Sequence, residues 1–468
     1  MGTLHFSERQ LLLLFGDVGA GVIALLTATW FREVWDDPGN AWVSVWVVVL
    51  GTIHVMVARA TDAQDLGRAR NPFSGSYDAV RAWLLTFLIY LAVPYWSAPL
   101  LFSRNLVAQV ASLGFGLTVA WRLIYAALAG RTGSVTRYVA LGGGPGVGAI
   151  ARAIGDKLGQ DHILLGYVDT MPNAMQTAVD VDAPTATWGA DHIPCLGSVD
   201  TLPRVVASGE VSTLIVVVGG SLTPELQRHV IAAYEAGIRV VPMPDLFEAV
   251  TGRVPIAHAN DFWSTTLSGA GRDWDYRLAA RARDIAIAIV GLAITAIIVP
   301  FVAVAMYLHG PGPTFYRQVR LGRNGRPFTI WKFRSMVPDA EASGGAQWAR
   351  PGDARVPTVG RFLRATRLDE FPQFWNVLRG EMSVVGPRPE RPELIDRLEA
   401  AVPFYRVRLA VLPGLTGWAQ VHAPYAASEA DTLVKFEYDL YYLRHRSLYL
   451  DLLILVKTLG VVARYRGR

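Results

Sequence analysis

Asp369 and Glu370 are adjacent carboxylates that closely precede Pro372. Proline is favoured in the first turn of a helix, where its missing N–H leaves no hydrogen bond unmade. We therefore expect both carboxylates near the positive end of a helix dipole, where an anion is stabilised and phosphate is bound. A carboxylate in that place stays ionised and can act as a nucleophile or as a metal ligand.

Basic side chains stand on both sides of this pair. Arg388 lies in the stiff turn at residues 386–389, and Arg364 shortly precedes the carboxylates. The fork of a guanidinium matches phosphate oxygens, so we expect Arg388 and Arg364 to bind phosphate. Lys332 and Arg334 are secondary candidates, because their alternation with aromatic residues is typical of a strand that presents both on one face. Carboxylates for a cation and arginines for phosphate indicate phosphoryl transfer. The alternative for each arginine is a surface charge or a carboxylate partner.

Further sequence blocks stand in order around these residues. They read FYRQVRLGRNGRPFTIWKFRSM at 315–336, VGRFLR at 359–364, PGLTGWAQV at 413–421 and KFEYDLYY at 435–442. Together with the central stretch they cover about residues 275–466, and over this region the chain resembles the bacterial polyprenyl-phosphate hexose-1-phosphate transferases. Members of this family are membrane enzymes that move a sugar phosphate from a nucleotide sugar to a lipid carrier.

The resemblance implies that the protein transfers a hexose-1-phosphate from a UDP-sugar to undecaprenyl phosphate and releases UMP. This would be the first step of exopolysaccharide, capsule or O-antigen synthesis. Asp369 would be the nucleophile that forms a covalent phosphosugar intermediate, and Glu370 would assist as a metal ligand or general base. Two carboxylates this close repel each other, which raises their affinity for Mg²⁺, the expected cofactor. No feature of the sequence selects the sugar.

The N-terminal part of the chain predicts a membrane bundle. Hydrophobic residues make up 52% of the chain and the mean hydropathy is +0.29, which is high for a soluble protein. Four apolar runs approach the roughly 20 residues that a spanning helix needs, at 11–31, 41–58, 82–101 and 106–129. Arginines cluster after the second and fourth runs, so both ends of this four-helix bundle, residues 1–131, are expected in the cytoplasm. Asp17 and Arg122 lie at similar depth and are expected to pair.

Residues 132–265 are predicted to form a Rossmann-like α/β domain in the cytoplasm. An apolar strand pattern runs into a turn that contains Gly142 and Gly144 and opens a helix. The dinucleotide-binding fingerprint is imperfect, since Val147 occupies the position of its third glycine. Asp169 stands about where a ribose-binding acid is expected. Gly142, Gly144 and Asp169 are therefore candidate nucleotide-binding residues, and packing of the turn alone is the alternative.

A fifth apolar run, residues 285–308, lies within the segment 275–309. A helix that crossed the membrane here would place everything after it outside the cell, away from nucleotide sugars. Pro300 removes one helical hydrogen bond, and we predict that it turns the segment into a re-entrant membrane hairpin with both ends at the cytoplasmic face. The resemblance implies the same, whereas length alone favours an ordinary kinked spanning helix.

The α/β catalytic domain, residues 310–468, is expected on the cytoplasmic face of the bacterial inner membrane. Its basic and apolar tail, from about residue 440, predicts an amphipathic helix on the lipids of the inner leaflet, or one that packs on the domain. The formal net charge is +5, and no basic patch interleaved with aromatic residues indicates nucleic-acid binding. Cys195 is the single cysteine, which excludes a disulfide framework and a thiolate zinc site.

Two other functions compete with the transferase. A membrane-tethered nucleotide sensor or scaffold would use the Rossmann-like domain, but the intact Asp369 and Glu370 with their flanking arginines argue against a lost activity. A nicotinamide-dependent oxidoreductase would need a Tyr-x-x-x-Lys pair after the Rossmann-like unit, and the sequence lacks one. A homodimer formed through the N-terminal half is left open.

Overall fold

The computed structural model divides into two compact units, residues 1–261 and 262–468. It describes residues 8–30, 43–61, 63–64, 68–69, 71–92, 104–131, 136–158, 162–170, 193–217, 222–256, 274–309, 312–337, 355–402, 404–423 and 429–463. The first unit contains a helical bundle and a parallel sheet, and the second contains the carboxylate pair.

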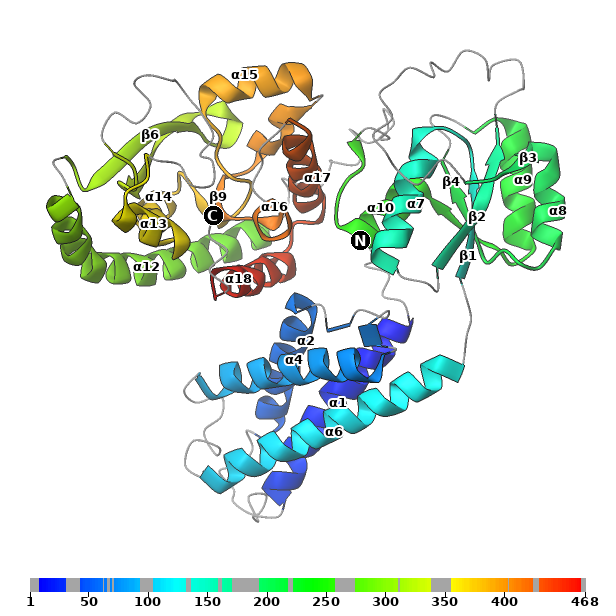
Figure 1. Ribbon diagram of the computed structural model, residues 1–468, viewed down its shortest axis with the longest axis horizontal. Helices are drawn as coiled ribbons and strands as arrows, with labels where there is room; N and C mark the ends of the chain where they lie inside the picture. The colour runs from blue at the N-terminus through cyan, green and yellow to red at the C-terminus, as the bar shows by residue number, and fades with distance from the viewer. Residues whose placement is uncertain are drawn as a thin grey trace. The chain divides into compact units, whose positions relative to one another are not determined.

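The helical bundle consists of α1 (Glu8–Trp30), α2 (Val43–Ala60), α4 (Pro72–Ala92) and α6 (Arg104–Arg131), shown in Figure 1. Within α6, residues Val107–Ala127 are long and apolar enough to cross a membrane, and α1 and α2 carry shorter apolar stretches, Leu12–Ala28 and Val45–Ala60. The bundle core is formed by apolar and aromatic side chains from all four helices, including Leu25, Leu50, Trp83 and Val110.

Helix α4 begins ten residues earlier than the third predicted apolar run. The side chain of Asn71 explains the start, because its Oδ1 accepts the backbone N–H groups of Phe73 at 3.0 Å and Ser74 at 3.3 Å. Pro72 in the first turn adds to this cap. The helix therefore extends beyond the start of the predicted apolar run, and residues 93–101 lie outside the described part of the chain.

The predicted pairing of Asp17 with Arg122 is confirmed. Arg122 Nε donates to Asp17 Oδ1 at 3.0 Å, and Arg122 Nη2 donates to the carbonyl oxygen of Ala63 at 2.8 Å. Both charged side chains are at most 1% exposed. The ion pair therefore joins α1 to α6 inside the bundle.

We expect Asp17→Asn to destabilise the bundle by about 3–5 kcal/mol, because it leaves the buried guanidinium of Arg122 without a counter-charge. Thermal unfolding of the full chain in detergent measures the loss. A second variant that also carries Arg122→Gln should recover part of the stability, since the uncompensated charge is then gone. Additive losses from the two substitutions would contradict an energetic coupling between them.

A parallel five-stranded sheet follows the bundle. Its strands are β1 (Thr136–Leu141), β2 (His162–Asp169), β3 (Cys195–Ser198), β4 (Thr213–Val216) and β5 (Arg239–Pro242), in the spatial order β3-β2-β1-β4-β5. This is the order of the first five strands of a Rossmann fold, and the predicted Rossmann-like domain is confirmed. Helices α8 (Leu202–Ala207) and α9 (Pro224–Glu235) cover one face, and α7 (Pro145–Leu158) and α10 (Met243–Thr251) cover the other (Figure 1).

Alternating side chains on the central strand explain why both faces are covered. Val139 and Leu141 pack with Leu214 and Leu226 on the face of α8 and α9. Tyr138 packs instead with Ile150, Ile154 and Phe247 on the face of α7 and α10. Successive residues of a strand point to opposite faces, so an apolar β1 requires helices on both sides.

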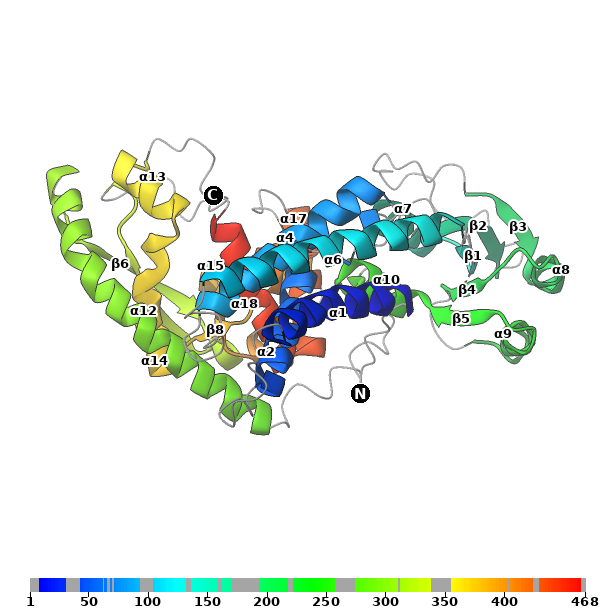
Figure 2. The ribbon, with the colours of Figure 1, turned by 90° about the horizontal axis from the view of Figure 1, so that it is seen from below.

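The second unit begins with one long helix, α12 (Trp274–His309), which continues through Pro300 without a turn (Figure 2). The predicted hairpin is therefore corrected: the chain does not reverse direction within residues 275–309. Val302 and Met306, after the proline, pack against Phe333 and Leu363. This packing supports a helix on both sides of the missing hydrogen bond, which bends the segment instead of breaking it.

The remaining elements form the α/β domain that carries the carboxylate pair. The antiparallel hairpin of β6 (Phe315–Leu321) and β7 (Pro327–Phe333) is followed by α13 (Thr358–Ala365), the 3₁₀ helix η6 (Leu368–Gln373) and α14 (Phe374–Arg379). Strands β8 (Ser383–Val385) and β9 (Gly414–Thr416) pair in parallel. Helices α15 (Pro392–Ala401), α16 (Trp418–His422), α17 (Glu429–His445) and α18 (Leu448–Ala463) and the 3₁₀ helix η7 (Tyr405–Ala410) complete the unit.

The predicted C-terminal amphipathic helix is two helices, because the chain leaves the helical path between α17 and α18. Ser447 caps the second helix, where its Oγ accepts the N–H of Leu450 at 3.2 Å. Asp451 and Ile454 of α18 are fully buried. Helix α18 therefore packs on the catalytic domain through one side, and its contact with lipid stays a prediction.

Candidate active site

The two carboxylates lie in the first turn of η6, as predicted. Asp369 and Glu370 are each 8% exposed. Arg367 precedes the turn with a φ of 58°, a left-handed conformation that costs an ordinary residue about 1–2 kcal/mol. Pro372 lies inside η6, and α14 follows without a gap. The site is therefore built on a short, tightly wound helical segment.

Glu370 is surrounded by positive charge. Its Oε1 accepts hydrogen bonds from Arg388 Nη2 at 2.8 Å and from Lys332 Nζ at 3.2 Å, and its Oε2 lies 3.8 Å from Arg367 Nη1. Burial alone would raise the pKa of this carboxyl, but Arg388, Lys332 and Arg367 hold it well below its usual range. Glu370 is thus a permanent anion that fixes the basic side chains around it.

Asp369 lacks the hydrogen bonds that hold its neighbour Glu370. Its Oδ1 is buried and has no hydrogen-bond partner. Burial, together with the negative charge of Glu370, raises the pKa of Asp369 to about 6, while Lys332 and other nearby cations partly offset the rise. A buried acceptor without a partner requires an explanation, and a bound ligand or ion is one. Asp369 therefore offers one reactive oxygen to an incoming group.

Arg388 is held by a rigid turn. Every backbone carbonyl from Pro387 to Glu390 accepts a hydrogen bond from β9, η7 or β6. The pairs are Gly414 N with Pro387 O at 2.8 Å, Arg408 Nη2 with Arg388 O at 3.0 Å, Arg320 Nη1 with Pro389 O at 3.1 Å, and Leu321 N with Glu390 O at 3.0 Å. Backbone held at every residue positions the side chain of Arg388 against Glu370 in advance of any substrate.

The other three predicted basic residues, Lys332, Arg364 and Arg334, differ in how they contact the carboxylate pair. Lys332, in β7, joins Arg388 at Glu370. Arg364, in α13, donates its Nε to Ser335 Oγ at 3.0 Å, and its charge still lowers the pKa of Asp369. Arg334 follows the end of β7 and is 8% exposed; its backbone N–H donates to Thr314 O. The structure therefore brings Lys332 and Arg388 to the carboxylate pair, and Arg364 lies close by.

Two basic residues at the site were not among the predicted ones. Arg367 lies three residues before Glu370, a helical spacing at which side chains meet. Tyr316 of β6 is paired with Lys332 of β7, so their side chains share a face of the hairpin. Every second side chain of a strand points to the same face, so Arg320, four residues after Tyr316, also lies on the face of Lys332. Burial, and next the charge of Arg388, lower the pKa of Arg320 to about 10. The spacing signal for Arg367 was present in the sequence.

A magnesium ion fits Asp369 better than Glu370. No cluster of three or more His, Cys, Asp or Glu side chains suited to a metal occurs in the described residues. Mg²⁺ commonly takes only one or two protein carboxylates and completes its shell with water and substrate phosphates. The unpartnered Oδ1 of Asp369 suits that role, whereas both oxygens of Glu370 face cations.

The candidate nucleotide-binding residues gather at the carboxyl ends of β1 and β2 in the Rossmann-like sheet. Gly142 and Gly144 adopt φ values of 120° and 83°, which favour glycine. The N–H of Gly142 donates to Val168 O at 2.9 Å. A methyl group built on Gly143 would lie 3.6 Å from Oδ1 of Asp169, so that carboxylate borders the turn. Nucleotides bind at this edge of Rossmann folds, so nucleotide binding by these three residues stays a prediction.

Comparison with known proteins assigns the second unit to a protein family. Residues 275–465 match the family described as bacterial sugar transferase, and residues 59–240 match a family described as CoA-binding domain. The chain is 41% identical over 183 residues to the UDP-glucose:undecaprenyl-phosphate glucose-1-phosphate transferase of Caulobacter vibrioides, across 39% of this chain and 68% of that relative. This chain belongs to the bacterial sugar transferase family. The match and the long apolar helices α6 and α12 make it a membrane protein.

Longer sugar transferases are similar over a wider region. The UDP-N-acetylgalactosamine-undecaprenyl-phosphate N-acetylgalactosaminephosphotransferase of Aeromonas hydrophila is 40% identical over 241 residues, 52% of this chain and 56% of the relative. The UDP-glucose:undecaprenyl-phosphate glucose-1-phosphate transferase of Escherichia coli (strain K12) is 39% identical over 232 residues, 47% of each chain. The chain therefore spans about half the length of these two relatives. The region matched to the sugar transferase family runs from α12 into α18 and includes both carboxylates and Arg388.

Proposed function

We propose that the protein transfers a hexose-1-phosphate from a UDP-sugar to undecaprenyl phosphate and releases UMP, thereby initiating the synthesis of a surface polysaccharide. The observation that carries this proposal is the contrast within the carboxylate pair. Asp369 keeps one unpartnered oxygen, while Glu370 is saturated by Arg388 and Lys332. The names of the relatives, which specify UDP-sugars and undecaprenyl phosphate, support the same substrates.

The reaction proceeds in two displacements. One oxygen of the Asp369 carboxylate attacks the phosphorus that carries the sugar; a bond forms between this oxygen and phosphorus, and the bond to the oxygen of UMP breaks. A phosphate oxygen of undecaprenyl phosphate then attacks the same phosphorus, and the bond to Asp369 breaks. The product is a sugar linked to the lipid through a diphosphate, and Asp369 is again a free carboxylate.

The basic residues stabilise the charge that moves during both steps. Arg388 presents a side chain that is 36% exposed, so it reaches phosphate oxygens while Glu370 fixes its position. Lys332 adds a partly buried positive charge at the same oxygen of Glu370, Oε1. Mg²⁺, held by Asp369 and the phosphates of the substrate, would supply further neutralisation of the diphosphate.

The contacts of α12 support a re-entrant position in the membrane. The α/β domain covers one side of this helix from Arg281, which donates to Val377 O at 2.7 Å, to Met306, which packs on Phe333. At 1.5 Å per residue this stretch is about 37 Å long, more than the roughly 30 Å of a bilayer core. A domain in water cannot follow a helix across the whole membrane. The other side exposes apolar residues, among them Ile297, Phe301 and Val304.

We therefore propose that α12 lies in the inner leaflet with both ends at the cytoplasmic face, although it is one bent helix and not a hairpin. Helices α1, α2, α4 and α6 would cross the membrane, with the catalytic domain in the cytoplasm. Cysteines introduced singly at Asp275 and at His309, in a protein that also carries Cys195→Ser, test this arrangement. Both should react with a membrane-impermeant reagent only after the inner membrane is opened, and reaction of one from outside would contradict it.

Release of UMP from a panel of UDP-hexoses tests the proposed function. The purified full chain in detergent is supplied with Mg²⁺ and undecaprenyl phosphate, and each sugar is tried in turn. Release that depends on the lipid supports the transferase and names the sugar. No release from any sugar would favour the nucleotide-sensing or scaffold function instead.

The acid side of the pH profile should report the ionisation of Asp369. Its carboxylate is the attacking form, so kcat/KM for the UDP-sugar should fall about tenfold per pH unit below a pKa of about 6. The negative charge of Glu370 raises that pKa, so Glu370→Gln should move the acid limb to lower pH, whatever its effect on the maximal rate. An acid limb that stays in place in this variant would show that another group titrates.

A further inference from the structure

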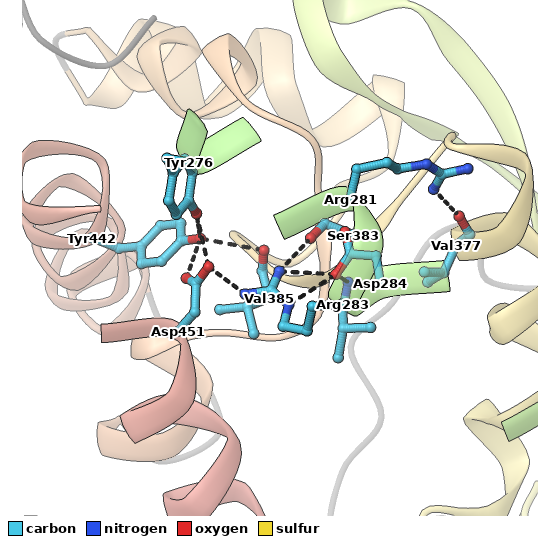
Figure 3. A network of polar contacts seen from close by, with 10 residues as sticks. Tyr276, Arg281, Arg283, Asp284, Val377, Ser383, Val385, Tyr442 and Asp451 are labelled. Carbon is cyan, nitrogen blue, oxygen red and sulfur yellow. Dashed lines mark hydrogen bonds and ion pairs between the residues drawn. The ribbon is translucent and has the colours of Figure 1, made fainter. Parts of the chain in front are cut away.

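Helix α12 contacts the strand that leads into the Arg388 turn. Val384 of β8 donates its N–H to Asp284 Oδ1 at 3.2 Å. Arg283 Nη2 lies 3.4 Å from Oγ of Ser383, the preceding residue of β8 (Figure 3). Arg283 also pairs with Asp284, at 2.8 Å. Because β8 ends at Val385, directly before the turn, these contacts fix the backbone from which Arg388 extends.

Asp451 of α18 closes this network on the opposite side. The carboxylate is fully buried and accepts hydrogen bonds from Tyr276 OH at 2.8 Å and Tyr442 OH at 2.9 Å, and it forms an ion pair with Arg283 (Figure 3). The hydroxyl of Tyr442 also lies 3.3 Å from the carbonyl oxygen of Val385. All three residues of β8 are therefore held by side chains of α12 or α17.

The same helix contacts the carboxylate half of the site. A methyl group built on Gly291 would lie 2.3 Å from Cδ2 of Phe374, so the ring packs directly on the helix backbone. Thr295 Oγ1 lies 3.5 Å from the carbonyl oxygen of Phe371, the residue after Glu370. Thus the start of α14 and η6 rest on α12 about two and three turns, respectively, beyond the contact with β8.

We propose that α12 is the scaffold that sets the separation between the nucleophile and the phosphate-binding arginine, with Arg283 and Asp284 as positioning residues for Arg388. This inference rests on the proposed function of Asp369 and Arg388. Both halves of the site contact one continuous helix, so a shift of β8 on that helix moves Arg388 away from Glu370 and Asp369. A misplacement of about 1 Å at a catalytic site lowers a rate by about 10²-fold.

A double-mutant cycle between Asp284 and Arg388 tests the positioning role. Asp284→Ala should lower kcat/KM for the UDP-sugar by about 10- to 100-fold, because the N–H of Val384 loses its acceptor. Asp284→Asn keeps an acceptor oxygen and should restore most of the rate. In a protein that already carries Arg388→Ala, the same Asp284→Ala substitution should cost less than about threefold, since it then has no arginine to displace.

Two controls separate positioning from general damage. Arg277→Ala changes an exposed arginine of the same helix and should leave the rate unchanged. Gly291→Ala should lower the rate through η6, and its loss should persist in the Arg388→Ala protein, because it acts on the carboxylate half. An equal loss from Asp284→Ala with and without Arg388 would overturn the proposal, since a purely structural effect does not depend on Arg388.

Amide hydrogen exchange provides a test that does not depend on activity. Asp284→Ala should speed exchange in residues 383–389, and Arg277→Ala should not. A wild-type protein that transfers no sugar would refute the proposed function, and the exchange data would still decide whether α12 holds β8. Unchanged exchange in residues 383–389 of Asp284→Ala would refute that contact.

Discussion

Asp369→Asn should abolish the lipid-dependent release of UMP, with kcat falling by about 10⁴-fold or more. An amide has nearly the same shape as the carboxylate but is a very poor nucleophile toward phosphorus. The wild-type protein, given a UDP-sugar without the lipid, should accumulate a phosphosugar adduct on the peptide that contains Asp369. Intact-protein mass spectrometry should detect that adduct in the wild type and not in the variant.

Loss of activity in this variant should not come from unfolding. The pKa of Asp369 is raised to about 6 in the folded protein, above its ordinary value, so the ionised form at neutral pH is disfavoured by the fold. A neutral asparagine removes that penalty, and the melting temperature should stay equal or rise. Asp275→Asn, the same change at an exposed carboxylate, is the matched control and should be fully active. Equal UMP release from Asp369→Asn and wild type would show that another residue is the nucleophile.

Local chemistry explains the part of the structure that the sequence predicted. Pro372 and the prolines beside Arg388 restrict only their immediate neighbours, so the helical turn and the stiff turn were both predictable. Asp17 and Arg122 were predictable as a pair because a charge within an apolar helix needs a partner at the same depth. The apolar strand at residues 136–141 likewise required helices on both faces.

Contacts between residues far apart in the chain determine the features that the sequence did not predict, which are the continuous helix α12 and the place of Arg320. Pro300 inside a helix costs about 3 kcal/mol, and α12 stays continuous because Val302 and Met306 gain burial against the α/β domain. Arg320 reaches the site only because β6 lies beside the turn that begins 66 residues after it, at Gly386 (386 − 320). The short-range pattern of the chain encodes neither contact, so sequence alone predicted a hairpin and left Arg320 unassigned.

Replacement of Arg388 by lysine distinguishes phosphate binding from a purely structural ion pair. We expect Arg388→Lys to lower kcat/KM for the UDP-sugar by about 10²- to 10³-fold, similar to the loss of one transition-state donor. A lysine keeps the positive charge beside Glu370, but it lacks the planar fork that binds two phosphate oxygens at once. If Arg388 served only to pair with Glu370, lysine would preserve that pair and cost little.

Arg367 is the matched comparison, because it also faces Glu370 but at the longer distance of 3.8 Å. Arg367→Lys should lower kcat/KM far less than Arg388→Lys, since no rigid turn positions its guanidinium for a ligand. Steady-state kinetics with both variants, together with melting temperatures, make the comparison. Equal losses at the two positions would show that the positive charge around Glu370 matters as a whole, and that the geometry of the 386–389 turn adds nothing to substrate binding.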